Sequence, residues 1–397
     1  GGGLTMTSTV LSPVQERGRA ALDKLGLPTR RQEAWRLTDL KRLEALAGLP
    51  LSSAAPSPEL PSVAAGVSRI VLDGQSDPLN GVDLPDGVSV LSPAELEQAL
   101  GHTLDRCGCA DSWPVELNHA SARQVLALRV RGAVPPLELV LAGAAGLTAT
   151  RVVLLVEEKA TLELLQVLHS DGPSAHSHVL EVHLGQEAQL RHGLIATADG
   201  EASLMTHLAV EQEPRSHYAF TSVVQGWNLA RVEPRVVQVD GQASTVLKGL
   251  AVSQAEQQLA THTAVRFDGP EGELDQLQKC LAGDRSHAIF NGAIQVPREA
   301  QRTNAAQLSR NLLLSERARL DTKPELEIVA DDVRCAHGAT VSQLQEDELF
   351  YLQSRGIAAA EAAALLLRGA CQEVIEHLPA SAAAWDPLGR VMRGLSR

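Results

Sequence analysis

The sequence feature that most constrains the fold is a long series of short, strand-like runs between residues 147 and 330. These runs are rich in Val, Leu and Thr, and Gly, Asp, Pro or Asn interrupts them at short intervals. Aliphatic and β-branched residues that alternate with polar ones, bounded by turn residues, are typical of short β-strands. This part of the chain is therefore predicted to consist of strands connected by tight turns.

Small-residue steps recur within this region at a nearly regular spacing. Their alanines are 28, 14, 28 and 13 residues apart, at positions Ala160, Ala188, Ala202, Ala230 and Ala243. Spacings near multiples of 14 indicate stacked coils, each of which turns a corner at a small residue. The pattern favours a mainly β fold with a parallel β-helix core, and a β-sandwich is the alternative that it leaves open.

The patterns on either side divide the 397 residues into four predicted parts. Residues 1–65 are predicted to hold two short helices followed by a linker rich in Pro, Ser and Ala. Residues 66–146 form a mixed α/β lead-in, because short apolar runs and turn residues alternate there without a clear period. The predicted β-helix core spans residues 147–340, and residues 341–397 are predicted to form a helical domain.

Two helices are predicted in the C-terminal domain. The segment Glu346–Ser354 is acidic at its start and is followed by Arg355 and Gly356, which suits the helix dipole and a glycine at the C-terminal end. A second helix is predicted from residue 358 to 378, because apolar residues recur every four positions until Pro379. We expect most of this apolar stripe to pack on its own domain.

The net charge and the cysteines argue against a nucleic-acid-binding, membrane-bound or disulfide-bonded protein. The formal net charge of −13 argues against general binding to nucleic acid or to an anionic membrane. The best candidate for a membrane span, residues 137–156, contains Glu138 and Arg151, so no span is predicted. Five irregularly spaced cysteines do not form a disulfide framework, and they suit a reducing compartment.

Several catalytic motifs are absent from the sequence. It contains no G-x-x-x-x-G-K-[ST] loop that would cradle phosphates, no H-E-x-x-H, no G-x-S-x-G and no G-x-G-x-x-G. Any ATP hydrolysis linked to this chain is therefore expected to come from a partner.

Residues 284–357 closely resemble the C-terminal signature of the SufD family of iron–sulfur cluster assembly proteins. The matching pieces are Asp284, Phe290–Gly292, Ala300–Ala305, Gln307, Asn311–Ser315, Lys323–Ile328, Ala330–Thr340 and Leu349–Ile357. The segment Arg31–Leu40 is also similar, although Leu37 stands where the family usually has Tyr, and Val115–Ala120 is a weaker match. The related SufB proteins typically have Glu after the histidine of the Cys-x-His segment. Here Gly338 follows His337, which favours SufD.

This resemblance implies a right-handed parallel β-helix between helical N-terminal and C-terminal parts. It also implies a non-catalytic scaffold subunit that pairs with a SufB-like homologue and an ABC-type ATPase like SufC, in the cytoplasm or in a plastid stroma. A nascent iron–sulfur cluster, or iron, would be held transiently at the subunit interface, with none bound permanently by this chain alone. Whether the isolated chain forms a homodimer is left open.

Cys335 and His337 are the strongest candidates for metal ligands. If their segment is a strand, residues two apart point to the same face and lie roughly 7 Å apart between Cα atoms. A thiolate and a neutral imidazole then suit iron or zinc. The alternative is a buried cysteine beside a structurally bonded histidine. Because an iron–sulfur cluster needs about four protein ligands, the pair is predicted to be half a site that a partner chain completes.

Other candidates carry weaker signals. Cys107 and Cys109 lack metal-ligand partners at suitable spacing, His176 and His178 are expected to be surface histidines beside a loop, and Cys280 and Cys371 are expected to lie in the core. The resemblance implies an ATPase docking surface on the C-terminal helices, and the residues proposed for it are Leu349, Phe350, Tyr351, Arg355, Gly356 and Leu366.

Two functions from other classes remain open on the sequence. A β-helix enzyme that acts on polysaccharide would need clustered carboxylates or basic residues in a groove. A purely structural, self-pairing protein would need no metal ligand at all. The Cys-x-His segment argues against the enzyme, and co-purification with an ATPase and a SufB-like chain would separate all three functions.

Overall fold

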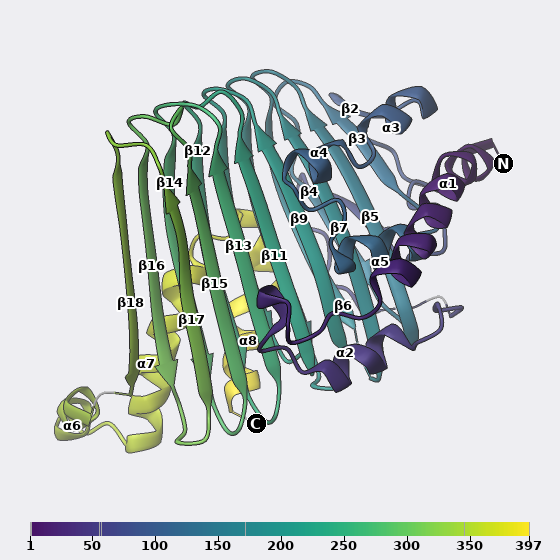
Figure 1. Ribbon diagram of the computed structural model, residues 1–397. Helices are drawn as coiled ribbons and strands as arrows, with labels where there is room; N and C mark the ends of the chain where they lie inside the picture. Colours follow the sequence, from purple (N-terminus) through teal and green to yellow (C-terminus); the bar gives the residue numbers. More distant parts are fainter. Residues whose placement is uncertain (1, 55, 57, 171, 345, 397) are drawn as a thin grey trace.

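The computed structural model describes residues 2–54, 56, 58–170, 172–344 and 346–396. Within these residues the strands form two nine-stranded sheets, which lie face to face along the length of the molecule (Figure 1). Sheet A contains, in spatial order, β17 (Arg319–Ile328), β15 (His287–Val296), β13 (Gln258–Phe267), β11 (Leu229–Gln238), β9 (Ser203–Gln212), β7 (Ser174–Leu184), β5 (Gly146–Val156), β3 (Leu126–Val130) and β2 (Val88–Val90). Sheet B contains β1 (Ser68–Leu72), β4 (Leu137–Ala142), β6 (Thr161–Ser170), β8 (Gln189–Ala198), β10 (His217–Gln225), β12 (Ser244–Ser253), β14 (Glu273–Ala282), β16 (Asn304–Leu313) and β18 (Arg334–Gln343).

From β3 onward, consecutive strands alternate between the two sheets, so the chain winds as a parallel β-helix. Thr161 pairs with Gln189, and Gln189 pairs with His217, so one full coil takes 28 residues there. Each half-coil therefore takes 14 residues, which explains the period of the alanines. The structure confirms the β-helix core and the helices at both ends, and it excludes the β-sandwich.

A repeated corner precedes each strand of sheet B from β6 to β16. The residue two positions before the strand has a positive φ, at Lys159, Glu187, Arg215, Gln242, Glu271 and Arg302. A small residue follows and is buried, at Ala160, Ala188, Ser216, Ala243, Gly272 and Thr303. The N–H of the positive-φ residue donates to a carbonyl of the next corner, as Lys159 does to Gln186 (2.9 Å) and Glu271 does to Gln301 (2.9 Å). A larger side chain at the buried position would meet the packed interior, so this position favours Ala, Gly, Ser or Thr.

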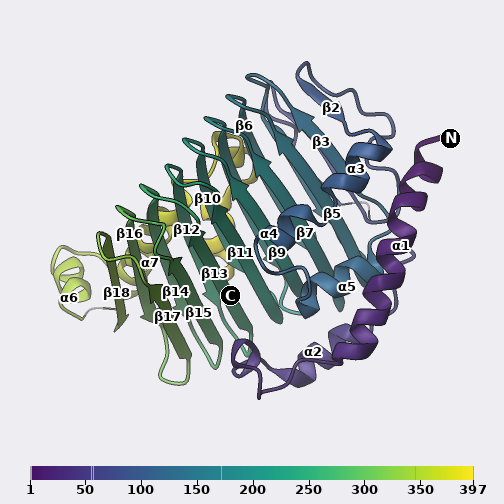
Figure 2. The same ribbon diagram turned by 45° about the horizontal axis from the view of Figure 1, so that its top comes forward.

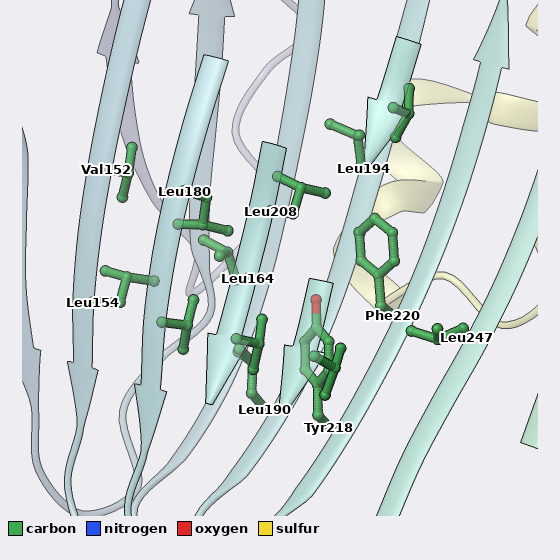
Figure 3. Close-up of a cluster of buried hydrophobic side chains, with 14 of the residues drawn as sticks. Val152, Leu154, Leu164, Leu180, Leu190, Leu194, Leu208, Tyr218, Phe220 and Leu247 are labelled. Atoms are coloured by element: carbon green, nitrogen blue, oxygen red, sulfur yellow. The ribbon is translucent and has the colours of Figure 1, made fainter. Parts of the chain in front are cut away.

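The lumen between the sheets is filled by the inward side chains of every coil (Figure 3). Leu164, Leu190, Leu208 and Phe220 are at most 2 % exposed, so each coil rests on the apolar side chains of the previous one. Burying one such side chain contributes about 1.5–3 kcal/mol to folding. The scarcity of aromatic residues is thus compensated by stacked Leu and Val.

Helices cover the outer faces of both sheets, and Figure 1 shows α1 and α5 in front of the strands with α7 and α8 behind them. Trp35, Trp113 and Leu117 pack on sheet A, and Cys371, Val374 and Trp385 pack on sheet B. The helices are α1 (Gly2–Leu25), η1 (Glu33–Trp35), α2 (Leu40–Ala47), α3 (Pro93–Ala99), α4 (His102–Arg106), α5 (Trp113–Ser121), α6 (Glu346–Ser354), α7 (Ala359–Ile375), η2 (Ala380–Trp385) and α8 (Pro387–Leu395).

The helix predicted at residues 346–354 is confirmed as α6, and the second C-terminal helix is confirmed as α7, three residues shorter at its end than predicted. Among the described residues, no helix combines the length and the hydropathy that a membrane crossing requires.

A buried charge cluster fixes the N-terminal segment to sheet A. Glu233 on β11 lies 3.3 Å from Arg231, 2.8 Å from Arg235 and 3.1 Å from His207. Arg231 stacks over the ring of Trp35 at 3.7 Å and donates to the carbonyl of Ala34. Burial alone would raise the pKa of Glu233, but Arg231, His207 and Arg235 outweigh it and hold that pKa well below its ordinary value. The cluster therefore keeps its carboxylate charged inside the protein.

Candidate functional site

The C-terminal end of the β-helix is open. Within the described residues, β17 and β18 have a neighbouring strand on one side only, so each sheet ends in an unpaired edge. Leu326 and Ile328 pair in register with Ile294 and Val296, which are almost fully buried, yet they are themselves 36 % and 38 % exposed. Apolar lumen side chains and two strand edges together are features of an unfilled protein interface.

Both candidate ligands lie on β18, at this open end. Cys335 pairs in register with Ala305, and His337 pairs with Gln307. Ala305 and Gln307 are buried and face the lumen. Strand neighbours in register face the same side of a sheet. Cys335 and His337 therefore both point to the lumen side of the last coil.

The environment of the pair differs between its two side chains. Cys335 is half-buried against the lumen core, and burial raises the pKa of its thiol. The thiol is therefore protonated at neutral pH, and a bound metal would have to displace the proton. His337 is exposed and, within the described structure, makes no hydrogen bond. Its ring nitrogens are therefore available to a metal.

The described residues provide no complete metal site. No group of three or more His, Cys, Asp or Glu side chains among them is arranged to hold a metal ion. Cys335 and His337 could offer one soft and one borderline ligand, which is half of a coordination shell for iron.

The other cysteines are poor candidates. Burial raises the pKa of Cys107 to about 12, of Cys280 to about 12 and of Cys371 to about 11, and it raises that of Cys109 further. Cys280 and Cys371 lie in the core as predicted. The thiols of Cys107 and Cys109 donate to backbone carbonyls. These four remain thiols at physiological pH and are unreactive.

The prediction of surface histidines at 176 and 178 is wrong, because both lie on the lumen face of β7 and are fully buried. A hydrogen-bonded chain in the lumen connects them, although Nδ1 of His176 has no hydrogen-bond partner within the described structure. Tyr218 donates to His192, His192 to Gln166, and Gln166 to Nε2 of His178. Nδ1 of His178 then donates to Thr150, whose hydroxyl donates to His176. Each ring thus has its tautomer fixed by the next member.

The predicted docking residues are divided between α6, the turn that follows it and α7. Tyr351 and Leu366 line one cavity of about 310 Å³ with Asp347, Glu348 and Leu352. Arg355 stacks over Tyr351 at 5.2 Å, and Gly356 has a φ of +86° at the turn after α6. Leu349 is half-buried.

Phe350 is 72 % exposed on α6, away from this cavity. No described residue of α6 is buried. In Figure 2 the helix stands beside β18, at the end of the molecule opposite α1. An exposed aromatic side chain on a helix without buried contacts is a candidate anchor for a partner.

Sequence comparison identifies the family of the chain. Residues 139–370, more than half of the chain, match the family described as "SUF system FeS cluster assembly, SufBD core domain". An iron–sulfur cluster assembly SufBD family protein of Synechocystis is 31 % identical over 92 % of this chain and 87 % of its own length.

Two further relatives extend the comparison. The iron–sulfur cluster assembly protein SufD of Escherichia coli is 28 % identical over 93 % of this chain and 90 % of its own length. A protein of Arabidopsis thaliana named ABCI7, chloroplastic, is 37 % identical over 58 % of this chain and 49 % of its own length. The β-helix, the Cys-x-His-Gly segment and these matches agree: the chain belongs to the SufBD family of iron–sulfur cluster assembly proteins and is SufD-like.

Proposed function

We propose that this chain is a non-catalytic scaffold subunit that pairs through its open end with a SufB-like subunit and helps to hold a nascent iron–sulfur cluster at the junction. One observation carries the proposal. Cys335 and His337 point into the lumen of the last coil, where both sheets end in unpaired edges.

The open end suits a partner that is itself a β-helix. Its strands would add to the edges of β17 and β18, so that main-chain hydrogen bonds continue across the junction. The exposed apolar residues of the last coil, such as Leu326, Ile328 and Val341, would then be covered. In this arrangement the partner lies next to Cys335 and His337 and supplies the remaining ligands. The cluster is cargo, and it is passed on after assembly.

ATP hydrolysis would come from a SufC-like ATPase. This chain has no phosphate-cradling loop. We place the docking surface on α6 and the start of α7, with Phe350, Tyr351, Leu366 and Arg355 as contacts and Leu349 and Gly356 shaping the turn. Because α6 follows β18 in the chain, a movement of this helix would be transmitted directly to the strand that carries the ligands. The assembly belongs in a compartment that keeps thiols reduced, the cytoplasm or a plastid stroma.

Cluster reconstitution tests the site. The Cys335→Ser and His337→Ala variants are each expected to fold, to pair with the SufB-like subunit and to bind less than half of the iron and sulfide that the wild-type complex binds. Each variant removes one ligand but little buried apolar area, so the free energy of unfolding should change by only about 1 kcal/mol. Iron and sulfide analysis, with the visible absorbance of the anaerobic complex, measures the outcome.

Cys107→Ser is the matched control, because it removes a thiol that donates to backbone carbonyls and faces no imidazole ligand. Its complex should bind wild-type amounts of iron and sulfide. A normal cluster yield from the Cys335→Ser, His337→Ala double variant would remove the site and leave a self-pairing structural scaffold.

A separate variant tests docking. Phe350→Asp is expected to reduce ATPase binding at least tenfold without a change in thermal stability, since the side chain is 72 % exposed and contributes little to the fold. Val90→Asp places the same charge on a 52 % exposed apolar residue at the other end of the molecule and should bind normally. Equal affinities of the two variants for the ATPase, measured by calorimetry, would show that docking has been placed wrongly.

A further inference from the structure

We propose that Gln307 is a positioning residue for His337: when a metal binds, its amide oxygen accepts the N–H of the imidazole and so directs the other ring nitrogen to the metal. The inference rests on the proposed function and adds a residue to it. Gln307 lies on β16, one coil before the open end, and pairs in register with His337. Neighbouring strands lie about 4.8 Å apart, which puts the imidazole within reach of the amide.

The amide of Gln307 is fixed by a chain of hydrogen bonds across the lumen. Its Nε2 donates to Oε1 of Gln276 at 3.0 Å, and Nε2 of Gln276 donates to the hydroxyl of Thr263 at 2.8 Å. Gln276 lies on the preceding coil of sheet B, and Thr263 lies on sheet A. The amino group of Gln307 is thus directed away from the open end.

Among the described residues, the amide oxygen of Gln307 has no hydrogen-bond donor and can face the open end. Within the described structure no donor reaches Oε1 of Gln307, although the side chain is only 5 % exposed. The amino group and the oxygen of an amide point in different directions. Because the amino group of Gln307 is bound to the preceding coil, its oxygen points toward the last coil. His337 is the residue in register there.

Close packing keeps the amide in this place. A Cβ on Gly292, across the lumen on β15, would lie 2.3 Å from Nε2 of Gln307. Glycine at this position therefore leaves room for the glutamine side chain. Gln307 is held by packing on one side and by the hydrogen bond to Gln276 on the other, so its oxygen is a fixed acceptor.

A fixed acceptor beside a metal-binding histidine selects its tautomer. The ring nitrogen that faces Gln307 must carry the proton, so the other nitrogen keeps its lone pair for the metal. Such partners of metal-ligating histidines commonly change metal affinity by about 10–100-fold when they are removed.

Titration of the full-length chain with Co²⁺, under anaerobic conditions, tests the proposal. The near-ultraviolet thiolate-to-cobalt absorption band reports binding at Cys335. Gln307→Leu, which keeps the volume and removes the acceptor, is expected to weaken Co²⁺ binding about tenfold. Gln307→Glu keeps an acceptor oxygen and should restore affinity to within about threefold of the wild-type chain.

Gln278→Leu is the matched control. Gln278 is a buried lumen amide on β14 that donates to Thr261. It pairs in register with Ser309, which pairs with Ala339, so it does not lie in register with His337. This variant should bind Co²⁺ like the wild-type chain. Wild-type affinity in Gln307→Leu, or equal losses in Gln307→Leu, Gln307→Glu and Gln278→Leu, would overturn the role of Gln307 and leave the proposed function intact. A wild-type chain without a thiolate band, indistinguishable from Cys335→Ser, would also overturn the role of Gln307, whereas the iron and sulfide bound by the complex with the SufB-like subunit decide the proposed function separately.

Discussion

Lowering the pH from 7 to 5 should strongly destabilise this protein, and buried histidines should be the main cause. His176, His178 and His192 lie in the lumen and His262 lies under the N-terminal segment, all of them at most 9 % exposed. Burial lowers the pKa of each to about 3. The lumen chain adds to this effect, because a protonated ring would lose the nitrogen that accepts from its neighbour.

The direction of the pH effect follows from the number of protons that the folded and the unfolded chain bind. In the unfolded chain these histidines titrate near their ordinary pKa of 6.5, whereas in the folded chain they stay neutral down to about 3. Between these values the unfolded state binds more protons, so the free energy of unfolding falls as the pH falls. Four histidines give a slope approaching about 5 kcal/mol per pH unit, and therefore a loss of about 8 kcal/mol by pH 5. A loss of that size is comparable to the whole stability of a typical domain, about 5–15 kcal/mol.

Urea unfolding at half-unit steps from pH 7 to pH 5, followed by circular dichroism, measures this slope. His192→Gln is expected to reduce it by about one proton, or roughly 1.4 kcal/mol per pH unit. His217→Gln, at an exposed position, serves as the control and should leave the slope unchanged. A free energy of unfolding that is constant between pH 6.5 and 5 would contradict the assignment of neutral, buried rings.

Glu233→Gln should destabilise the protein by about 3–5 kcal/mol, because it leaves Arg231, Arg235 and their buried charges without a carboxylate. The N-terminal segment should loosen at the same time, since Arg231 is the residue that stacks on Trp35. Urea unfolding gives the loss of stability, and tryptophan fluorescence reports the exposure of Trp35.

The same substitution at an exposed ion pair is the matched control. Glu271 lies 3.1 Å from Arg302, and both side chains are about half exposed, at 48 % and 56 %. Glu271→Gln should therefore cost no more than about 1 kcal/mol. If the two variants were equally stable, the cluster around Glu233 would not be the anchor that its burial indicates.

The fold was accessible to sequence reasoning because its repeat is local. Ala160, Ala188 and Ala243 sit at corners where a larger side chain would clash, so the geometry of each half-coil is recorded in the spacing of small residues. The Cys-x-His segment was likewise readable, because a strand places residues two apart on one face and the structure has both residues on β18.

What the sequence did not reveal depends on contacts across the lumen and between neighbouring coils. His176 and His178 resemble surface residues until Thr150 and Gln166 are placed beside them in the lumen. The alternation of residues within β7 would have put both on one face, but it does not say which face is inside. The contact of Glu233 with His207 and the register of Gln307 with His337 join residues 26 and 30 positions apart, which only the stacking of coils brings together.

The open end also has a consequence for how the chain is made. In a stack of coils each turn uses the previous one as its template, and a chain leaving the ribosome completes the N-terminal turns first. At every stage the growing molecule carries one unsatisfied rim, which the next turn covers. After β18 no strand follows among the described residues. The helices α7 and α8 pack instead on β10 and β12, which belong to coils that are already covered on both sides. The folded protein thus keeps its last coil uncovered. A β-helix subunit that binds there would extend the stack in the same way as a further coil of this chain.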